Sequence, residues 1–338
     1  MGKPMVTVYC LAYNHEKYIR KCLYSILGQK TNFPFKIIVN DDASTDNTRS
    51  IIEEIAAKYP DVIIPVLHDE NQFQKKVSVV KTHIEPRVES KYVAICEGDD
   101  YWCNSNKLQM QFDIMEANPK CGACLHRTAE VTEDEKKTGL YYPMQDLPTG
   151  VLSSKEFFDA FEPRMFHTTS YFFRASLWHA YLQDPPAYKA VCHVGDVPYL
   201  LYFGSKSRIY FINKVMSCYR RGGVSSFTYS RFQVNPERLI RHHLAIIRTY
   251  QEFDKETDGK YHWLCIRRIS KNMYAESALR KDFSEMTAEE NRDYYKGLPL
   301  AKRCTVLVGS VCPSLINKIY IDHLTKTEKK ERKRWNVD

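Results

Sequence analysis

The chain has 338 residues, of which 43% are apolar and 27% are charged, and its formal net charge is +8. This composition excludes a chain that is disordered throughout, and the length suits one large domain or a domain with an appendage. Eleven scattered cysteines, odd in number and often set in apolar runs, are typical of free buried thiols. No apolar run reaches transmembrane length and no signal-peptide pattern is visible, so we expect a cytoplasmic protein, peripheral at most to the inner face of the membrane.

The first third of the chain alternates β-branched runs with amphipathic patterns. Apolar runs at residues 5–11, 35–39, 62–67 and 92–95 predict four strands. Apolar residues at helical spacing follow the first two runs, at 19–27 and 51–55. Repeated strand–helix units predict an α/β fold with a doubly wound, mostly parallel sheet, whose ligands bind at the carboxyl ends of the strands.

The pattern becomes less regular beyond residue 103. We expect strands at 123–131, 166–173, 208–212 and 215–220, helices at 108–115 and 197–203, and a short helix opened by a capping box from Ser153 to Glu156. From about residue 236 the pattern is helical and polar. The chain should therefore consist of a domain over residues 1–228 and a helical C-terminal appendage over 229–338.

Two acidic clusters directly follow predicted strands. Asp41 and Asp42 follow the second strand, and Glu97, Asp99 and Asp100 follow the fourth. Because like charges this close repel, a hard divalent cation bound through oxygen ligands would stabilise the second cluster. The other interpretation is a solvated acidic turn, which the apolar residues on both sides disfavour.

The first 225 residues resemble the family 2 inverting glycosyltransferases, and three motifs carry the resemblance. They are Tyr13-Asn14 after the first strand, residues 40–46 after the second and Glu97-Gly98-Asp99-Asp100 after the fourth. The resemblance implies a GT-A fold, with a nucleotide-sugar-binding part at about 1–103 and an acceptor-binding part at about 104–228. It also implies transfer of a sugar from a nucleotide-sugar donor, most commonly a UDP-sugar, to a saccharide or lipid-linked saccharide acceptor in surface polysaccharide or glycoconjugate synthesis.

The resemblance further implies which residues bind the donor. Asp41 and Asp42 would contact the base and ribose, although the alternative is a plain loop with a helix N-cap at Ser44 or Asp46. The family's D-x-D metal signature matches residues 97–99 with a glutamate in first place, so Asp99 is the predicted ligand of Mn²⁺ or Mg²⁺ and Glu97 is the second candidate. The predicted nucleotide or donor contacts are Ala12, Tyr13, Asn14, Asp41, Asp42, Glu97, Gly98, Asp99, Arg220 and Arg221.

An inverting transfer also needs a general base that takes the proton from the acceptor hydroxyl. Asp196 stands at the family's position for this base, ahead of an apolar helix, although Gly195 replaces a common acid; a helix N-cap is the alternative for Asp196. The remaining predicted contacts, to the donor sugar or the acceptor, are Asp100, Trp102, His167 and Thr168. Alternatives are a basic surface turn for Arg220 and Arg221 and a buried structural role for His167.

Other functions remain open at this point. A sugar nucleotidyltransferase would need a Gly-rich loop after the first strand, which this chain lacks, and a non-catalytic nucleotide-sugar-binding subunit of a glycan-assembly complex is also compatible with Glu97 and Gly195. No zinc-finger spacing or aromatic RNA-binding signature points to nucleic acid. The basic run from Lys326 to Arg334, with the apolar stretches 306–309 and 315–320 before it, predicts either a surface for an anionic membrane or a packed helix with a solvated end.

Overall fold

The computed structural model describes residues 2–161, 165–221 and 235–334, and it divides into two compact units. The first unit contains Met1–Pro185 and Tyr202–Ser225, and the second contains Pro186–Leu201 and Ser226–Asp338. The division passes through α7 (Asp196–Lys206), whose first six residues fall in the second unit. Across the described ranges, no helix is both long enough and apolar enough to span a membrane.

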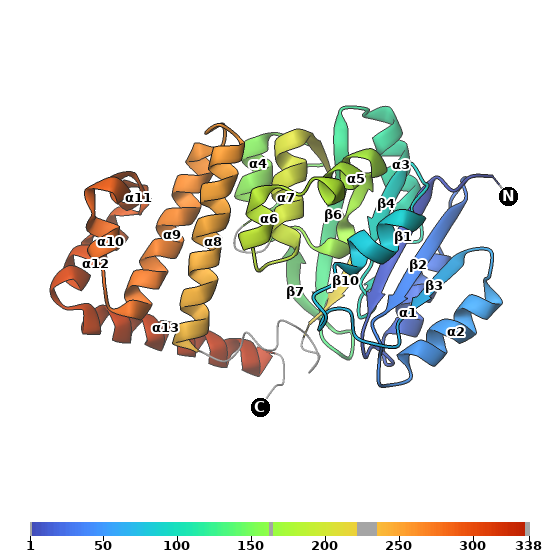
Figure 1. Cartoon of the computed structure of the whole chain (residues 1–338), viewed down its shortest axis with the longest axis horizontal. Coiled ribbons are helices and arrows are strands. Elements are labelled where there is room, and N and C mark those ends of the chain that lie inside the picture. Colours follow the sequence, from blue (N-terminus) through green and yellow to red (C-terminus); the bar gives the residue numbers. More distant parts are fainter. Residues whose placement is uncertain (1, 162–164, 222–234, 335–338) are drawn as a thin grey trace. The chain divides into compact units, whose positions relative to one another are not determined.

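The first unit is built on one sheet, in which ten strands are described (Figure 1). Strands β1 (Val6–Ala12), β2 (Phe35–Asp41), β3 (Ile63–Leu67) and β4 (Tyr92–Ile95) pair in parallel in the order β3-β2-β1-β4. The order then continues through β9, β6, β10 and β5, with β7 paired to β6 and β8 to β10. The bounds of these strands are β5 (Tyr101–Trp102), β6 (Cys121–Val131), β7 (Lys137–Tyr142), β8 (Gly150–Leu152), β9 (Phe172–Arg174) and β10 (Arg208–Arg220).

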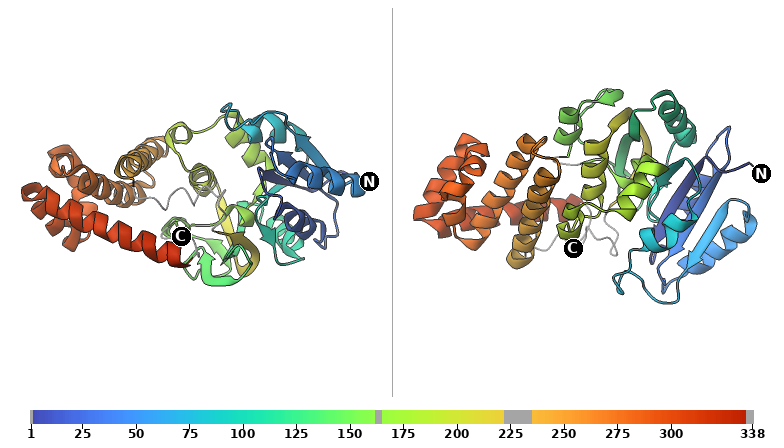
Figure 2. Two further views of the ribbon diagram at one scale, coloured as in Figure 1. Left: turned by 90° about the horizontal axis from the view of Figure 1, so that it is seen from below. Right: turned by 45° about the horizontal axis from the view of Figure 1, so that its top comes forward.

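Helices cover both faces of this sheet. Side chains alternate between the two faces along each strand, so the apolar side chains of β1 need cover on both sides. Val8 of β1 joins a core with α1, α2 and α3, whereas its neighbour Tyr9 turns to the other face and meets Trp178 of α5 at 6.0 Å between ring centroids. Figure 2 shows the strands and these helices from two further sides. The helices of this unit are α1 (Ile19–Leu27), α2 (Thr48–Lys58), α3 (Lys107–Ala117), α4 (Ser154–Asp159) and α5 (Ala175–Gln183), besides the second half of α7.

Three expected strands are corrected by the structure. Residues 208–220 form the single strand β10, because the two expected strands are joined through shifts of register beside β6, between Ile212 and Ser217. Residues 166–173 are not one strand. Thr168–Ser170 form a 3₁₀ turn, because the carbonyl of His167 accepts the N–H of Ser170, and β9 begins only at Phe172.

The second unit is helical. It contains α6 (Ala187–Val191), α8 (Pro236–Glu256), α9 (His262–Arg280), α10 (Ser284–Thr287), α11 (Arg292–Gly297), α12 (Leu300–Val311) and α13 (Pro313–Arg334). Helices α8 and α9 pack along each other, and the buried Phe253 of α8 meets Tyr261 and Tyr188 with ring centroids 5.6 and 5.4 Å away. The predicted α/β fold with a C-terminal helical region is confirmed.

Candidate functional site

Loops that follow β1, β2 and β4 meet at the carboxyl edge of the sheet. Ala12, at the end of β1, pairs with Asp41, at the end of β2. The chain after β4 runs on beside β1, because the N–H of Gly98 donates a 2.9 Å hydrogen bond to the carbonyl of Leu11. Both predicted acidic clusters therefore lie next to the end of β1, as the parallel arrangement requires.

Polar contacts tie the loop after β1 to the loop after β2. The N–H of Asn14 donates to Oγ of Ser44 (2.9 Å), and Oδ1 of Asn14 accepts the N–H of Thr45 (2.8 Å). Asn14 has a φ of 55°, a left-handed conformation that asparagine tolerates better than most residues. Asp46 accepts the N–H of Thr48 (2.9 Å) at the start of α2. The N-cap residue of this helix is Asn47, whose side chain makes no capping hydrogen bond, so Asp46 bonds to the start of the helix without being its N-cap residue.

Asp41 and Asp42 both hold the loop that surrounds them. The buried Asp41 carboxylate accepts the N–H of Ser44 (3.2 Å) and its hydroxyl. The Asp42 carboxylate accepts the N–H groups of Gln72 (2.6 Å) and Phe73 (3.1 Å). A carboxylate has about four acceptor sites, so these bonds leave capacity for a base or ribose donor.

Gly98 is required by close packing. A Cβ added at this position would lie 2.7 Å from Nδ1 of His15, 3.1 Å from Cβ of Ala12 and 3.1 Å from the carbonyl oxygen of Leu11. Two of these three neighbours are backbone or Cβ atoms, which cannot rotate away. Glycine at position 98 thus lets the loop carrying Glu97 and Asp99 press against the end of β1.

His15 stands next to Asp99 and was missed by the sequence reasoning. Its Nε2 lies 3.9 Å from Oδ2 of Asp99, and the two side chains are 16% and 28% exposed. Its Nδ1 is buried and has no hydrogen-bond partner among the described residues. The available signal was its position, directly after Tyr13-Asn14 at a strand end that faces the ligand edge of the sheet.

The residues at this edge are suited to a divalent metal ion that is bound jointly by the protein and a nucleotide. The Asp99 carboxylate and the half-buried Glu97 offer the oxygen donors that Mg²⁺ and Mn²⁺ prefer. Within the described ranges, no group of three or more His, Cys, Asp and Glu side chains is placed to hold a metal ion. A metal here would therefore take few protein ligands and complete its shell with phosphate oxygens and water, as nucleotide-bound Mg²⁺ does.

Asp100 is buried, next to the half-buried Glu97 and Asp99. Its Oδ1 accepts the N–H of Arg220 (2.8 Å), and its Oδ2 is 3.8 Å from Nδ1 of His167. Burial, with the neighbouring charge of Asp99, raises the pKa of Asp100 well above its usual range. Burial lowers the pKa of His167 to about 3, so this ring is neutral at pH 7, and it stacks on Tyr219 at 4.1 Å.

Arg220 and Arg221 are both engaged by the protein. The Arg220 guanidinium donates from Nε to the carbonyl of Asp99 (3.0 Å) and from a terminal nitrogen to the carbonyl of Glu133 (2.9 Å). Arg221 donates to the buried carboxylate of Glu130 (3.0 Å). Contact of either guanidinium with a donor stays a prediction, and residues 222–225, which follow them, lie outside the described residues.

Trp102 belongs to the core under the site. Its Nε1 donates to the carbonyl of Thr169 (3.1 Å), next to Thr168 in the 3₁₀ turn. Nζ of the buried Lys107 lies 3.9 Å above the indole and donates to Oε1 of Gln111 (2.8 Å). Burial lowers the pKa of Lys107 to about 7.

The predicted base, Asp196, lies in a different unit from the acidic loops. It is the first residue of α7, and this part of the helix is grouped with the helical unit. The structure gives no arrangement of the two units, so the role of Asp196 stays a prediction.

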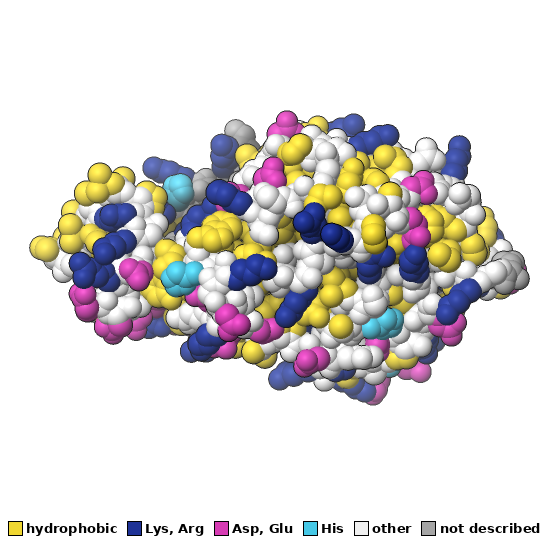
Figure 3. All heavy atoms as spheres, turned by 90° about the horizontal axis from the view of Figure 1, so that it is seen from above, with side chains coloured by type: hydrophobic (Ala, Val, Ile, Leu, Met, Phe, Trp, Pro, Cys, Tyr) yellow, Lys and Arg dark blue, Asp and Glu magenta, His cyan; other side chains and the backbone are white. Residues whose placement is uncertain are grey.

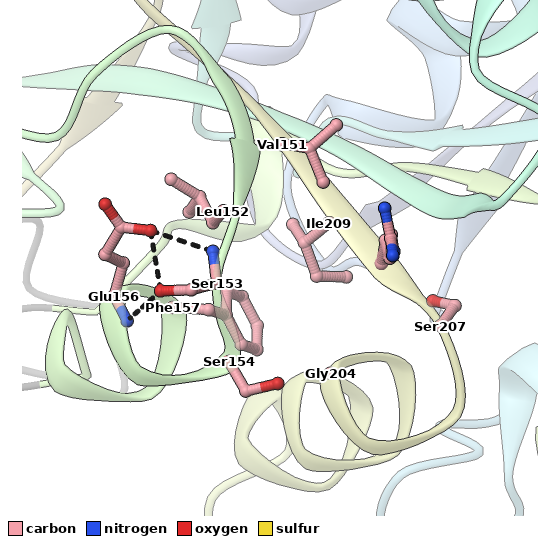
Figure 4. A pocket seen from close by; sticks show the side chains of 10 residues that line it. Val151, Leu152, Ser153, Ser154, Glu156, Phe157, Gly204, Ser207 and Ile209 are labelled. Atoms are coloured by element: carbon pink, nitrogen blue, oxygen red, sulfur yellow. Dashed lines mark hydrogen bonds between the residues drawn. The ribbon is translucent and has the colours of Figure 1, made fainter.

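A pocket of about 440 Å³ lies elsewhere in the first unit, between α4, β8 and the start of β10 (Figure 4). Ser153 and Glu156 at its wall form the reciprocal capping box that the sequence predicts. Ile209 lines the pocket from the first residues of β10, whereas Arg220 ends that strand. The pocket is thus at the opposite end of β10 from the acidic loops.

Comparison with known proteins identifies a family and several relatives. The model of glycosyl transferase family 2 matches residues 7–174. An uncharacterized protein of Mycobacterium tuberculosis is 34% identical over 160 residues, covering 45% of this chain and 44% of the relative. The Bacillus subtilis protein TuaG, named as a teichuronic acid biosynthesis glycosyltransferase, is 33% identical over 113 residues, covering 33% of this chain and 42% of TuaG. The chain thus spans less than half the length of these curated relatives.

Solved structures share the fold over most of the chain. TarS 1–349 of S. aureus aligns with a TM-score of 0.59 at 15% identity, covering 94% of this chain and 91% of TarS 1–349. The same protein in complex with UDP-GlcNAc aligns with a TM-score of 0.57, also at 15% identity, covering 94% and 92% of the two chains. At this level of identity the likeness establishes the fold alone.

Proposed function

Because residues 7–174 of this chain belong to glycosyl transferase family 2, we propose that the protein is an inverting transferase that moves a sugar, of the hexose type, from a nucleotide-sugar to an acceptor hydroxyl. The observation that carries the proposal is the meeting of Asp41, Asp42 and Asp99 at the end of β1, where Gly98 admits the loop after β4. A UDP-sugar is the proposed donor, and the UDP-GlcNAc complex of TarS supports that choice. The name of TuaG supports a place in surface polysaccharide or glycoconjugate synthesis.

In this proposal the acidic loops divide the donor between them. Asp41 and Asp42 accept hydrogen bonds from the base and ribose, beside Ala12, Tyr13 and Asn14. Asp99 holds Mn²⁺ or Mg²⁺, with Glu97 as the second candidate. The metal, when bound, offsets the charge that builds on the departing nucleoside diphosphate.

The buried groups then act as positioning residues. Asp100 and Arg220 hold the loop of Asp99 through the bonds described above, so we assign Arg220 a positioning role beside its predicted contact with the donor. Trp102 and His167 support the same loop, because the indole bonds to the carbonyl of Thr169 and the His167 ring lies 3.8 Å from the Asp100 carboxylate. Contact of Thr168 with the donor sugar or the acceptor stays a prediction.

Asp196 is the proposed general base. A carboxylate near neutral pH can accept the proton of the acceptor hydroxyl as this oxygen attacks the anomeric carbon. Its place at the start of α7, ahead of an apolar helix, supports this assignment. The proposed acceptor is a saccharide or lipid-linked saccharide, and the proposed location is cytoplasmic and peripheral at the inner face of the membrane.

A donor screen tests the proposal. Recombinant protein with Mn²⁺ or Mg²⁺ is incubated with UDP-, GDP- and dTDP-sugars, and release of the nucleoside diphosphate is followed. Slow hydrolysis of one donor, abolished by removing the metal, is the expected result. Release of pyrophosphate from a nucleoside triphosphate and a sugar phosphate would instead indicate a nucleotidyltransferase. Binding of a nucleotide-sugar without hydrolysis or transfer would indicate a non-catalytic nucleotide-sugar-binding subunit.

A further inference from the structure

The exposed apolar side chains of the described structure are concentrated on two consecutive helices. Thirteen large apolar side chains are exposed in the described part of the chain, and six of them fall within residues 300–319. We call these six the apolar face: Leu300, Leu307, Val308, Val311, Leu315 and Ile319. Val311 is 87% exposed and Leu300 74%, so these side chains are not the margins of a core.

On α12 the apolar face forms one outward stripe. At 100° per residue, positions 300, 304, 307, 308 and 311 fall within an arc of about 100°. The inward side of α12 is already used, because Val306 is buried and a Cβ at Gly309 would meet the ring of Phe283 at 2.5 Å. The outward stripe therefore has no counterpart among the helices that α12 packs against in the described unit.

On α13 the apolar face runs into lysines. Positions 315, 319, 326 and 330 lie within about 60° of one another around the helix, so Leu315 and Ile319 continue into the exposed Lys326 and Lys330. Residues 300–338 contain nine Lys and Arg against four Asp and Glu, which supplies +5 of the net charge of +8. Figure 3 shows the helical unit, at the left of the picture, from the side opposite α13, with hydrophobic, basic and acidic side chains interspersed.

We infer that the apolar face, with Lys326 and Lys330 beside it, docks on an anionic lipid bilayer. The apolar side chains would enter the boundary between headgroups and acyl chains while the lysines meet acidic headgroups. A second copy of the chain fits less well, because joining two such faces would bring their positive charges together. The binding itself is inferred without the proposed function. Only its biological role rests on that function, since a lipid-linked acceptor would lie at the same membrane surface.

Vesicle flotation tests the inference without any nucleotide or activity. The wild-type chain is mixed with phosphatidylcholine vesicles that contain either no acidic lipid or a third phosphatidylglycerol. Binding to the acidic vesicles alone is expected. The double variant Leu307→Gln/Val311→Gln should bind the acidic vesicles at least about tenfold more weakly, because two apolar side chains are lost. Binding of Lys326→Gln/Lys330→Gln should also be weakened about tenfold or more, since each lysine contributes roughly a fivefold effect.

A matched control is Met144→Gln, which removes an exposed apolar side chain of the first unit and should leave vesicle binding unchanged. Melting temperatures of all variants should match the wild type, because the replaced side chains are exposed. Absence of vesicle binding would overturn the inference. A wild-type dimer, seen by light scattering without lipid and lost in the Leu307→Gln/Val311→Gln variant, would also overturn it, because the apolar face would then join two copies of the chain. The assay requires no enzymatic activity, so absence of vesicle binding would leave the proposed transfer reaction untouched and would contradict only the proposed location at the membrane.

Discussion

The backbone N–H of Arg220 donates a 2.8 Å hydrogen bond to Oδ1 of Asp100, across 120 positions of sequence. The same arginine bonds the carbonyl of Asp99 through Nε. The end of β10 therefore fixes the loop that presents Asp99, the proposed metal ligand. The geometry of the half-buried Asp99 carboxylate therefore depends on the buried pair of Asp100 and Arg220.

Replacing Arg220 tests this dependence. Arg220→Lys keeps the backbone bond to Asp100 and the charge but loses the planar fork that reaches the carbonyls of Asp99 and Glu133. We expect the free energy of unfolding to fall by about 1–3 kcal/mol, because the carbonyls of Asp99 and Glu133 lose their guanidinium donors. Urea denaturation measures the loss, and metal-dependent UDP binding should weaken with it. The exposed Arg49→Lys is the control; equal effects of the two substitutions would contradict a positioning role.

Gly98→Ala tests the packing of the loop after β4. Its Cβ would meet the carbonyl oxygen of Leu11 and Cβ of Ala12 at 3.1 Å, so the loop must shift. We expect destabilisation of about 1–3 kcal/mol and weaker nucleotide binding. Gly195→Ala is the stability control, because nothing lies within 4 Å of its added Cβ. An unchanged urea midpoint together with an unchanged UDP affinity in Gly98→Ala would show that the loop accommodates a Cβ at this position, and would contradict the prediction.

The buried Lys107 should make stability depend on pH. Its pKa is lowered to about 7, whereas in the unfolded chain it titrates near 10.5, so between these values the unfolded state binds one more proton than the folded state. Stability therefore rises with pH in this window and is lost as pH falls toward 7. Compared with Lys107→Met, the wild type should gain about 2 kcal/mol between about pH 7.5 and pH 9.5, in chemical denaturation. Parallel pH profiles of the two proteins would mean that the lysine stays charged when buried.

Local signals predict one half of the site and miss the other. Apolar runs end directly before Asp41 and shortly before Asp99, so the sequence places the acidic loops at the ends of strands. The family resemblance depends on the motifs that follow β1, β2 and β4 in this order. The contact between Arg220 and Asp100 joins distant segments, so no pattern along the chain indicates it. Lys107 is missed for another reason, because lysine is almost never fully buried and its cover of Trp102 and Gln111 comes from the tertiary fold.

Asp196→Asn separates chemistry from binding. The amide keeps the shape of the side chain but cannot take a proton at neutral pH. We expect transfer to fall by about a hundredfold or more, with UDP affinity within about twofold of the wild type. The transfer rate is measured as an initial rate with the donor found by the screen, and the UDP affinity is measured by calorimetry. Transfer at the wild-type rate would remove Asp196 from the mechanism.

Calorimetric titration of UDP into the protein, with and without Mn²⁺, tests the proposed donor site most directly. Binding should require the metal in the wild type and weaken at least about tenfold in Asp99→Asn, because a metal ligand is lost. The exposed Asp113→Asn on α3 is the matched control and should bind as the wild type does. Full metal-dependent affinity in Asp99→Asn would contradict a metal and diphosphate site at the carboxyl edge of β1, β2 and β4.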